Sequence, residues 1–308
     1  MFDKLPESVT IVEVGPRDGL QNEATVISLT NKVDLINALA ECGLKKIEAA
    51  SFVSPKWVPQ MANSEQVMQQ INRRSGVIYS ALTPNLRGFD DALKAELDEV
   101  AVFAAASETF SQKNINCSIE ESLERFKPII SSAKAHKIPV RGYLSCVLGC
   151  PYEGEIAVDD VVNLAKRLID MGCYQVSLGD TIGVGTATKV AQLIDQCLTV
   201  IPTQQLAVHF HDTYGQALAN VLVALQQGIH FIDASVAGLG GCPYAKGASG
   251  NLATEDLVYM LDNMGIHSGV DLNNLVTTGM QICNVLGRSN GSKVAQAIFP
   301  HQGCQPSK

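Results

Sequence analysis

The chain has 308 residues, of which 46% are hydrophobic and 18% charged, so it can bury a large core and is not intrinsically disordered. The net charge is −8, from 23 Lys and Arg against 31 Asp and Glu, and the sequence contains no basic run. We therefore expect no binding to nucleic acid or to an acidic membrane surface. These properties favour an enzyme that acts on a small molecule.

The nine cysteines are scattered through mostly apolar stretches and form no Cys-x-x-Cys pair. This usage is typical of buried, reduced thiols rather than of a disulfide framework. The N-terminal sequence lacks the pattern of a secretory or organellar leader, and the apolar stretches are shorter than the ~18 residues that a membrane span needs. We therefore expect a cytoplasmic protein.

Short apolar runs alternate with helix-like stretches along the chain, and the runs resemble parallel strands buried on both faces because their apolar residues are consecutive. The predicted strands are Val9–Val14, Lys46–Ala50, Val77–Leu82, Glu99–Ala104, Val140–Leu144, Gln175–Leu178, Gln205–His211 and Phe231–Val236. The predicted helices cover residues 30–42, 64–73, 88–95, 119–136, 158–171, 186–200, 215–227 and 254–264, and a further amphipathic segment is Leu272–Leu286. Ser64, Ser118 and Thr186 are predicted helix N-caps.

Eight such units predict an α/β fold, a (β/α)₈ TIM barrel with an additional C-terminal helix. We expect residues 1–308 to form a single catalytic domain, with the barrel at about 8–265 and a helical extension at about 270–300. A doubly wound open sheet is the alternative, but no Gly-x-Gly-x-x-Gly motif follows the first strand.

In such a barrel the catalytic groups lie where strands end and the following loops begin. The first predicted strand ends in VGPRDGLQNE, which places Arg17 and Asp18 side by side in a turn stiffened by Gly15, Pro16 and Gly19. A surface ion pair would explain the two charges. A charged pair in a stiff turn at a strand end nevertheless favours a functional role.

The seventh predicted strand ends in LAVHFHDTYG. His209 and His211 are two residues apart, so both side chains project from one face of an extended strand while Phe210 points to the other. Two imidazoles at one strand end can chelate one divalent ion, which we favour over two separate core histidines. Asp212 is ambiguous because it could instead cap the helix that follows.

The eighth strand continues into SVAGLGGCPYAKGASGNLATED, where five glycines predict a loop that can approach a substrate closely. Among the nine cysteines, Cys242 alone lies clearly in such a polar, glycine-rich segment, where a thiol could give or take a proton. Asn251 lies just before a helix, so capping and metal ligation are equally good interpretations of this residue.

The second strand ends in IEAASF and the sixth in SLGDTIG, which adds Glu48, Ser51, Ser177 and Asp180 to the candidates. The two carboxylates could be solvated, or they could hold the Arg17 guanidinium by charge-assisted hydrogen bonds.

The candidate metal ligands are oxygen and nitrogen atoms without a thiolate, which favours Mg²⁺ or Mn²⁺. Such an ion, together with a guanidinium on an enolate oxygen, predicts aldol- or Claisen-type carbon–carbon chemistry on a chelating substrate.

Six segments together resemble the 3-hydroxy-3-methylglutaryl-CoA lyase family: VGPRDGLQNE, IEAASFVSPKWVPQMA, ASETFSQKNINCSIEES, SLGDTIGVG, HFHDTYGQALAN and SVAGLGGCPYAKGASGN. The first and fifth also resemble isopropylmalate and homocitrate synthases, whereas the last is much more specific to the lyases. The resemblance covers nearly the whole chain. It implies a divalent-metal (β/α)₈ barrel that cleaves (S)-3-hydroxy-3-methylglutaryl-CoA, an acyl-CoA thioester, to acetyl-CoA and acetoacetate and acts as a homodimer.

The resemblance also implies roles for single residues. The implied ligands of Mg²⁺ or Mn²⁺ are Asp18, His209, His211 and Asn251. Arg17 would polarise the thioester carbonyl and steady the enolate, and Cys242 would transfer a proton; either Asp18, His209 or Cys242 would be the base. The other implied site residues are Glu48 and Asp180, near the reacting groups, and Ser51, Cys150 and Ser177, which would line the substrate pocket.

The last residues, FPHQGCQPSK, do not clearly match the cysteine-bearing tail of animal mitochondrial lyases, which implies a bacterial-type cytoplasmic enzyme.

Three other functions are alternatives to the lyase. A Claisen-type synthase of the same superfamily would condense acetyl-CoA with a 2-keto acid. A non-haem Fe(II) oxygenase would use the two histidines and Asp18 as a facial triad. A non-catalytic barrel would only bind an acyl-CoA.

Overall fold

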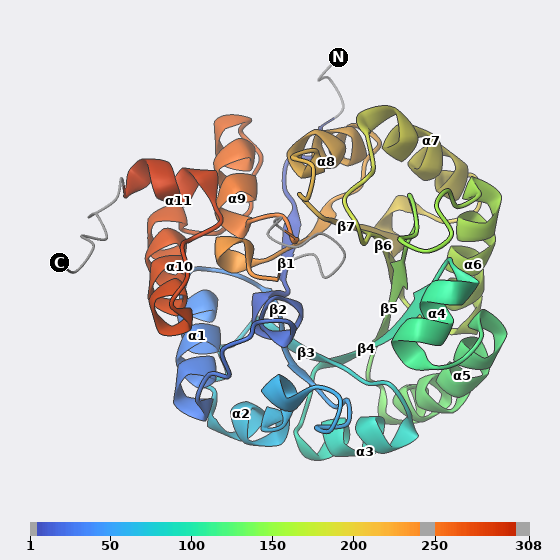
Figure 1. The fold of residues 1–308 in the computed structure, drawn as a ribbon, viewed down its shortest axis with the longest axis horizontal. Helices are drawn as coiled ribbons and strands as arrows, with labels where there is room; N and C mark the ends of the chain where they lie inside the picture. The colour runs from blue at the N-terminus through green and yellow to red at the C-terminus, as the bar shows by residue number, and fades with distance from the viewer. Residues whose placement is uncertain (1–4, 241–249, 300–308) are drawn as a thin grey trace.

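The computed structural model describes residues 5–240 and 250–299. Eight parallel strands form its centre (Figure 1). Neighbouring strands pair in chain order and β8 pairs with β1, so the sheet closes into a barrel. The strands are β1 (Thr10–Glu13), β2 (Lys46–Ser51), β3 (Ile78–Leu82), β4 (Glu99–Ala105), β5 (Val140–Ser145), β6 (Gln175–Asp180), β7 (Leu206–Phe210) and β8 (Phe231–Ala234). The predicted (β/α)₈ barrel is confirmed, and the doubly wound open sheet is wrong.

Helices surround the barrel in a ring (Figure 1). They are α1 (Leu29–Glu41), α2 (Ser64–Gln70), α3 (Leu86–Lys94), α4 (Glu108–Ile115), α5 (Ile119–His136), α6 (Val158–Met171), α7 (Ala187–Leu198), α8 (Ala217–Gln226), α9 (Thr254–Asn263), α10 (Leu272–Leu286) and α11 (Lys293–Ile298). All eight predicted helices are present: α5 and α6 have the predicted bounds, and the ends of the other six differ by up to three residues. The sequence did not predict α4, because a helix of eight mostly polar residues produces little apolar periodicity.

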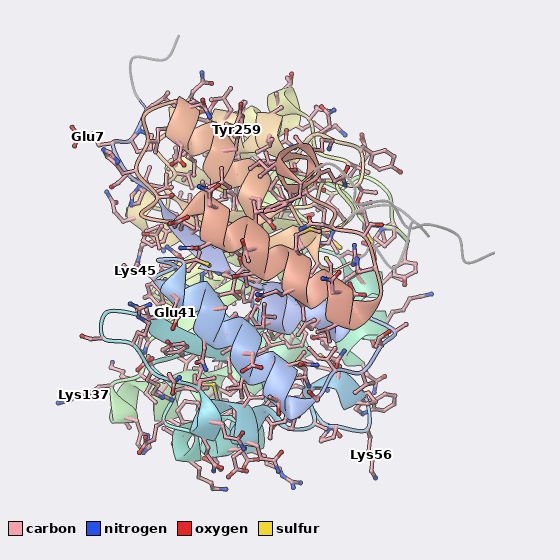
Figure 2. The ribbon with its side chains drawn as sticks, turned by 90° about the vertical axis from the view of Figure 1, so that its left-hand side faces the viewer. Glu7, Glu41, Lys45, Lys56, Lys137 and Tyr259 are labelled. Carbon is pink, nitrogen blue, oxygen red and sulfur yellow. The ribbon has the colours of Figure 1, made fainter. Side chains whose placement is uncertain are left out.

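The predicted C-terminal helix is α10, and the short α11 follows it. Helix α10 packs against α1 and α9, the helices that follow β1 and β8 (Figure 2). It therefore covers the outside of the barrel where the first and the last βα units meet.

Helix starts agree with the predicted caps only in part. Ser118 accepts the N–H of Glu121 while the Glu121 carboxylate accepts the N–H of Ser118, a capping box that confirms the prediction. Thr186 occupies the N-cap of α7 without a side-chain bond. Ser64 is instead the first residue of α2, and its hydroxyl donates to the carbonyl of Ser51. Its predicted capping role is wrong, because this hydroxyl ties α2 to the end of β2.

The strands are buried on both faces, as their consecutive apolar residues predicted. Two ion pairs join charged side chains of these strands across the barrel. Lys46 of β2 pairs with Glu99 of β4, and Arg141 of β5 pairs with Asp233 of β8. Because such pairs join strands that are not adjacent in the sheet, their side chains must cross the barrel interior.

The seven cysteines within the described residues are buried free thiols, in agreement with the expected reduced core cysteines, and Cys242 and Cys304 lie outside the described residues. No helix in the described part of the chain combines the length and apolar character that a membrane crossing requires.

Candidate metal centre and active site

The chain after β1 forms a single π-helical turn, Gly15–Gly19, that carries Arg17 and Asp18. Glu13, fully buried in β1, fixes this turn. Its Oε1 accepts the N–H of the first residue of the turn at 2.8 Å and the N–H of Val236, after β8, at 2.9 Å. The predicted stiff turn is therefore held by a carboxylate beneath it, and the same carboxylate connects the loops that follow β1 and β8.

Two glycines allow these loops to approach each other closely. A Cβ atom at Gly19 would lie 2.7 Å from both Cβ of Leu239 and Oγ of Ser235. Gly240 has a φ of +94°, and a Cβ atom there would lie 2.7 Å from Nδ2 of Asn251. Both distances are far below van der Waals contact, so larger residues would push the two loops apart.

The Arg17 guanidinium is buried between two carboxylates. Its Nε donates to Oε2 of Glu48 at 2.7 Å, and its Nη1 donates to Oδ1 of Asp18 at 2.7 Å. The ring centroid of Tyr143 lies 5.5 Å from the guanidinium carbon. Burial alone would lower the pKa of Arg17, but Glu48 and Asp18 together hold it above its usual value, so the group stays charged.

Asp180 does not belong to this arrangement. Among the described residues, Glu48 and Asp18 are the carboxylate partners of Arg17. The Asp180 carboxylate instead accepts the N–H groups of Val184 at 3.2 Å and Gly185 at 2.8 Å, which shapes the loop after β6. The hypothesis that Glu48 and Asp180 both hold Arg17 is therefore right for Glu48 and wrong for Asp180.

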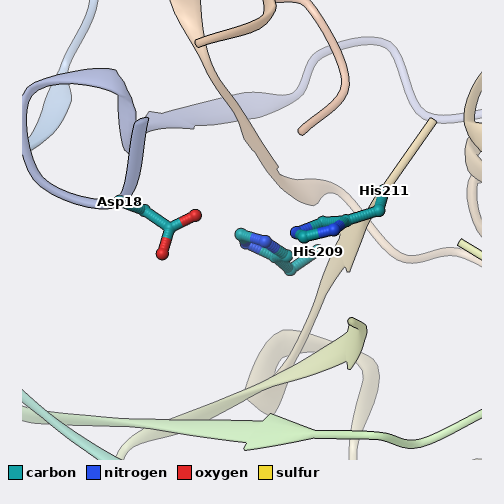
Figure 3. Close-up of side chains that lie close together, drawn as sticks. All are labelled: Asp18, His209 and His211. Atoms are coloured by element: carbon teal, nitrogen blue, oxygen red, sulfur yellow. The ribbon is translucent and has the colours of Figure 1, made fainter. Parts of the chain in front are cut away.

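His209 and His211 lie on the same side of the chain at the end of β7, with ring centroids 5.3 Å apart, as the two-residue spacing predicted. Figure 3 shows the Asp18 carboxylate, from the turn after β1, directed toward both rings. One donor atom from each of these three residues lies within 4.8 Å of the others. Donors on opposite sides of one Mg²⁺ ion are about 4.2 Å apart, so only a small movement of these side chains toward one another would let them hold a single cation.

Asn251 lies beside these three residues. Its Nδ2 donates to Oδ2 of Asp18 at 2.8 Å and to the carbonyl of Leu239 at 3.1 Å, and its backbone bridges to that of His211. The N-cap residue of α9 is Ala253, so the helix-capping interpretation of Asn251 is wrong. The amide therefore lies next to the Asp18 carboxylate, which sets its orientation.

Asp212 makes the helix-capping contact that was one of the two interpretations of this residue, although the N-cap residue itself is Gln216. Its Oδ1 accepts the N–H of Ala217, the first residue of α8, at 3.0 Å. This contact satisfies one of the free N–H groups at the start of the helix.

The electrostatics of the three converging residues suit a cation. Burial alone would raise the pKa of Asp18, but the opposite effect of Arg17, and then of His209, is larger. The pKa of Asp18 is therefore lowered to about 2, and the carboxylate is ionised at neutral pH. Burial and the neighbouring His209 lower the pKa of His211 to about 4, so this imidazole is neutral. Its buried Nδ1 has no hydrogen-bond partner among the described residues. An ionised oxygen and an unpaired imidazole nitrogen fit a hard divalent ion.

The remaining predicted site residues are spread around this centre. Ser51 is buried at the end of β2. In the loop after β5, Sγ of Cys150 lies 2.9 Å from Oγ of Ser107, the N-cap residue of α4. Ser177 lies deeper, inside the barrel, where its hydroxyl donates to Asp233. Cys242 lies outside the described residues.

Four buried polar residues that contact this centre or support it were not predicted from the sequence: Glu13, Arg141, Tyr143 and Asp233. Three of them are acidic or basic residues and lie within otherwise apolar strands. A charge in a strand that is buried on both faces needs a partner inside the barrel. That signal was present in the sequence and points to the barrel interior, although it does not identify the partners.

Comparisons with known proteins agree over nearly the whole chain. A family model described as HMGL-like matches residues 8–282. The mitochondrial hydroxymethylglutaryl-CoA lyase of Gallus gallus is 60% identical over 292 residues, 95% of this chain and 98% of that protein. The 3-hydroxy-3-isohexenylglutaryl-CoA/hydroxy-methylglutaryl-CoA lyase of Pseudomonas aeruginosa is 58% identical over 295 residues, 96% of this chain and 98% of that protein. The crystal structure of hydroxymethylglutaryl-CoA lyase from Pseudomonas aeruginosa superposes with a TM-score of 0.94 at 58% identity, covering 96% of this chain and 98% of that chain.

Proposed function

The chain belongs to the HMGL-like family, and from this premise we propose that it is a metal-dependent lyase that cleaves (S)-3-hydroxy-3-methylglutaryl-CoA to acetyl-CoA and acetoacetate. One observation carries the proposal from the structural side. The donor atoms of Asp18, His209 and His211 converge within 4.8 Å, next to the buried, permanently charged Arg17. A cation site beside a guanidinium suits a substrate that loses a hydroxyl proton and forms an enolate.

Asp18, His209, His211 and Asn251 would hold the ion, which we propose to be Mg²⁺ or Mn²⁺. The ionised Asp18 carboxylate, the unpaired nitrogen of His211 and the hydrogen bond from Asn251 to Asp18 support this ligand set. When bound, a divalent ion would lower the pKa of the substrate's C3 hydroxyl and stabilise the carbonyl that forms there.

The reaction breaks the bond between C2 and C3 of the acyl group. A base takes the proton of the C3 hydroxyl, C3 becomes the ketone carbon of acetoacetate, and C2 keeps the electron pair as the enolate of acetyl-CoA. Asp18, His209 and Cys242 are the candidate bases. The enolate then takes a proton at C2, for which we propose Cys242 as the donor on the strength of its glycine-rich sequence.

Arg17 would stabilise the enolate oxygen of acetyl-CoA. Its guanidinium is held by Glu48 and lies next to the ring of Tyr143, so it needs little rearrangement as negative charge develops on the substrate. Burial strengthens this interaction because water does not screen it. Glu48 would act by fixing Arg17, and Asp180 by shaping the loop after β6, while Ser51, Cys150 and Ser177 would contact the acyl group.

The experiment that tests this function uses purified protein and 3-hydroxy-3-methylglutaryl-CoA, with acetoacetate as the readout. We expect acetoacetate in the presence of Mg²⁺ or Mn²⁺, none after treatment with a chelator, and recovery when the ion is added back. Formation of a condensation product from acetyl-CoA and a 2-keto acid would instead indicate the synthase, and consumption of O₂ with Fe²⁺ the oxygenase. No turnover under any of these conditions would leave only a binding protein.

We further propose that the chain works as a single catalytic domain in a cytoplasmic homodimer. The family resemblance supports the homodimer and a place in leucine degradation and ketone-body formation. The buried free thiols of the described cysteines support a reducing compartment.

A further inference from the structure

We infer that Asp233 is a positioning residue for His209, and that the ion pair between Arg141 and Asp233 inside the barrel orients one imidazole of the metal centre. This inference rests on the proposed function, because it assumes that His209 is a metal ligand. It assigns a role in the metal centre to two residues of the barrel interior, Arg141 and Asp233.

Asp233 lies directly beside His209. The two residues are paired in the register between β7 and β8, and Oδ2 of Asp233 is 3.4 Å from Nδ1 of His209. The Asp233 side chain is fully buried, so bulk water does not compete with His209 for this carboxylate. Since Nδ1 faces Asp233, the other ring nitrogen, Nε2, is the one left for the side of Asp18 and His211.

The Asp233 carboxylate is itself held rigidly. Nη2 of Arg141 donates to Oδ1 at 2.7 Å and Nη1 donates to Oδ2 at 3.1 Å, so the pair is bidentate. Nε of Arg141 donates to Oε1 of Gln175 at 2.9 Å, and the Ser177 hydroxyl donates to Oδ2 of Asp233 at 2.8 Å. Each of the three guanidinium nitrogens therefore has a partner, and the carboxylate cannot turn away from His209.

The two histidines of the centre differ in this respect. Neither Nδ1 atom forms a hydrogen bond of standard geometry among the described residues, but that of His209 faces a carboxylate oxygen, Oδ2 of Asp233, at 3.4 Å, whereas that of His211 has no such ion-pair contact. A carboxylate beside Nδ1–H fixes the tautomer in which Nε2 carries the lone pair, and it makes that nitrogen a stronger ligand. His209 is therefore the oriented ligand of the pair, and Asp233 is the group that orients it.

A buried ion pair can also serve folding alone, and the barrel contains a pair that allows this to be tested. Lys46 and Glu99, the first residues of β2 and β4, pair at 2.7 Å near the opposite end of the strands. This second pair also includes a phenol, the hydroxyl of Tyr174, but it has no contact with either histidine of the centre in the described chain. Its side chains are 7% and 3% exposed, against 1% and 0% for Arg141 and Asp233, so both pairs are buried and Glu99→Gln is a matched control for Asp233→Asn.

The experiment compares Mn²⁺ binding to the metal-free forms of wild type, Asp233→Asn and Glu99→Gln, with free Mn²⁺ measured by electron paramagnetic resonance. An amide at position 233 would accept the Nδ1 proton only weakly or would donate to that nitrogen and reverse the tautomer. We expect a 10–100-fold weaker affinity for Mn²⁺ in Asp233→Asn, roughly the range seen when such supporting carboxylates are lost. Glu99→Gln should lower the melting temperature and leave the Mn²⁺ affinity unchanged.

A second readout is the ¹H–¹⁵N spectrum of histidine-labelled protein in its Mg²⁺ form, in which His209 should change tautomer signature in Asp233→Asn and keep it in Glu99→Gln. If Asp233→Asn does not fold, the double variant Asp233→Asn with Arg141→Gln takes its place in both measurements, because it also removes the guanidinium that the single variant leaves unpaired.

Wild-type Mn²⁺ affinity in a folded Asp233 variant, or an equal loss in Glu99→Gln, would overturn the inference alone. A wild-type protein that binds no Mn²⁺ would overturn the proposed function first and this inference with it.

Discussion

Arg17 illustrates how a single residue combines burial with a permanent charge. Its guanidinium is shared between Glu48, which is fully buried, and Asp18, which is partly exposed at the cation site. The Glu48 contact fixes the direction of the side chain. The Asp18 contact links the position of the guanidinium to that of the proposed ion, so both positive charges can act on one substrate.

We predict that Arg17→Gln lowers kcat by about 10²–10³-fold and raises KM much less, because it removes a donor whose interaction strengthens as the enolate forms. The measurement is steady-state acetoacetate release at saturating metal. Arg167→Gln is the control, since Arg167 forms an exposed pair with Glu120 on the outside of the barrel. Near-normal kcat in Arg17→Gln would show that the enolate role is wrong.

At the scale of elements, the loops after β1 and β8 are joined by hydrogen bonds to the same buried carboxylate, that of Glu13. Glu13 and Glu255 lie beneath them, fully buried, and Ala237 donates its N–H to both oxygens of Glu255, at 3.0 Å and 2.8 Å. Asp18 and Asn251, which hydrogen-bond each other, are carried by these two loops. The distance between the two elements therefore sets the geometry of the proposed ligands.

The close approach at Gly19 predicts the effect of a single methyl group. Gly19→Ala should destabilise the fold by about 1–3 kcal/mol, as overpacking does, and should also weaken Mn²⁺ binding because it displaces Asp18. Denaturant unfolding and Mn²⁺ titration measure the two effects. Gly142→Ala, in β5, is the control, since its added Cβ would lie at ordinary distances of 3.4–3.5 Å from its neighbours. A Gly19→Ala variant indistinguishable from this control would contradict the packing described.

The two buried carboxylates beneath these loops predict a pH dependence of stability. Burial raises the pKa of Glu13 to about 7 and that of Glu255 to about 8, from 4.5. As the pH rises, the unfolded chain therefore releases these protons before the folded chain does. The free energy of unfolding then falls between about pH 4.5 and pH 8, by about 1.4 kcal/mol for each unit by which the folded and unfolded pKa values differ. Below that window the contribution of the two groups is constant.

We expect Glu255→Gln, which keeps the neutral shape, to show a smaller fall in melting temperature between pH 5.5 and pH 8.5 than wild type. Other groups titrate in this range, so the difference between the variant and wild type is the quantity that matters. Glu120→Gln, an exposed carboxylate, should leave the fall unchanged. An identical pH dependence in wild type and Glu255→Gln would contradict the raised pKa.

For the whole molecule, the sequence predicts the architecture well because the architecture depends on local patterns. Consecutive apolar residues identify strands buried on both faces, and the barrel rule then brings together residues that are distant along the chain, such as Asp18 and His209. The spacing of His209 and His211 is also local, because alternate residues of a strand share one face.

Contacts that depend on depth inside the barrel were not predictable in this way. Nothing local distinguishes Glu48, which binds Arg17, from Asp180, which binds its own loop. Asn251 likewise precedes a helix as a cap would, but the cap is Ala253 and the amide contacts Asp18. Asp233 and Arg141 become partners only when β5 and β8 face each other across the closed barrel.

The most direct test of the central claim is a crystal structure of the protein grown with Mn²⁺, with the ion located by its anomalous scattering. We predict one strong anomalous peak per chain, within coordination distance of Asp18, His209 and His211. A peak at another place, or no peak where these three side chains converge, would contradict the account.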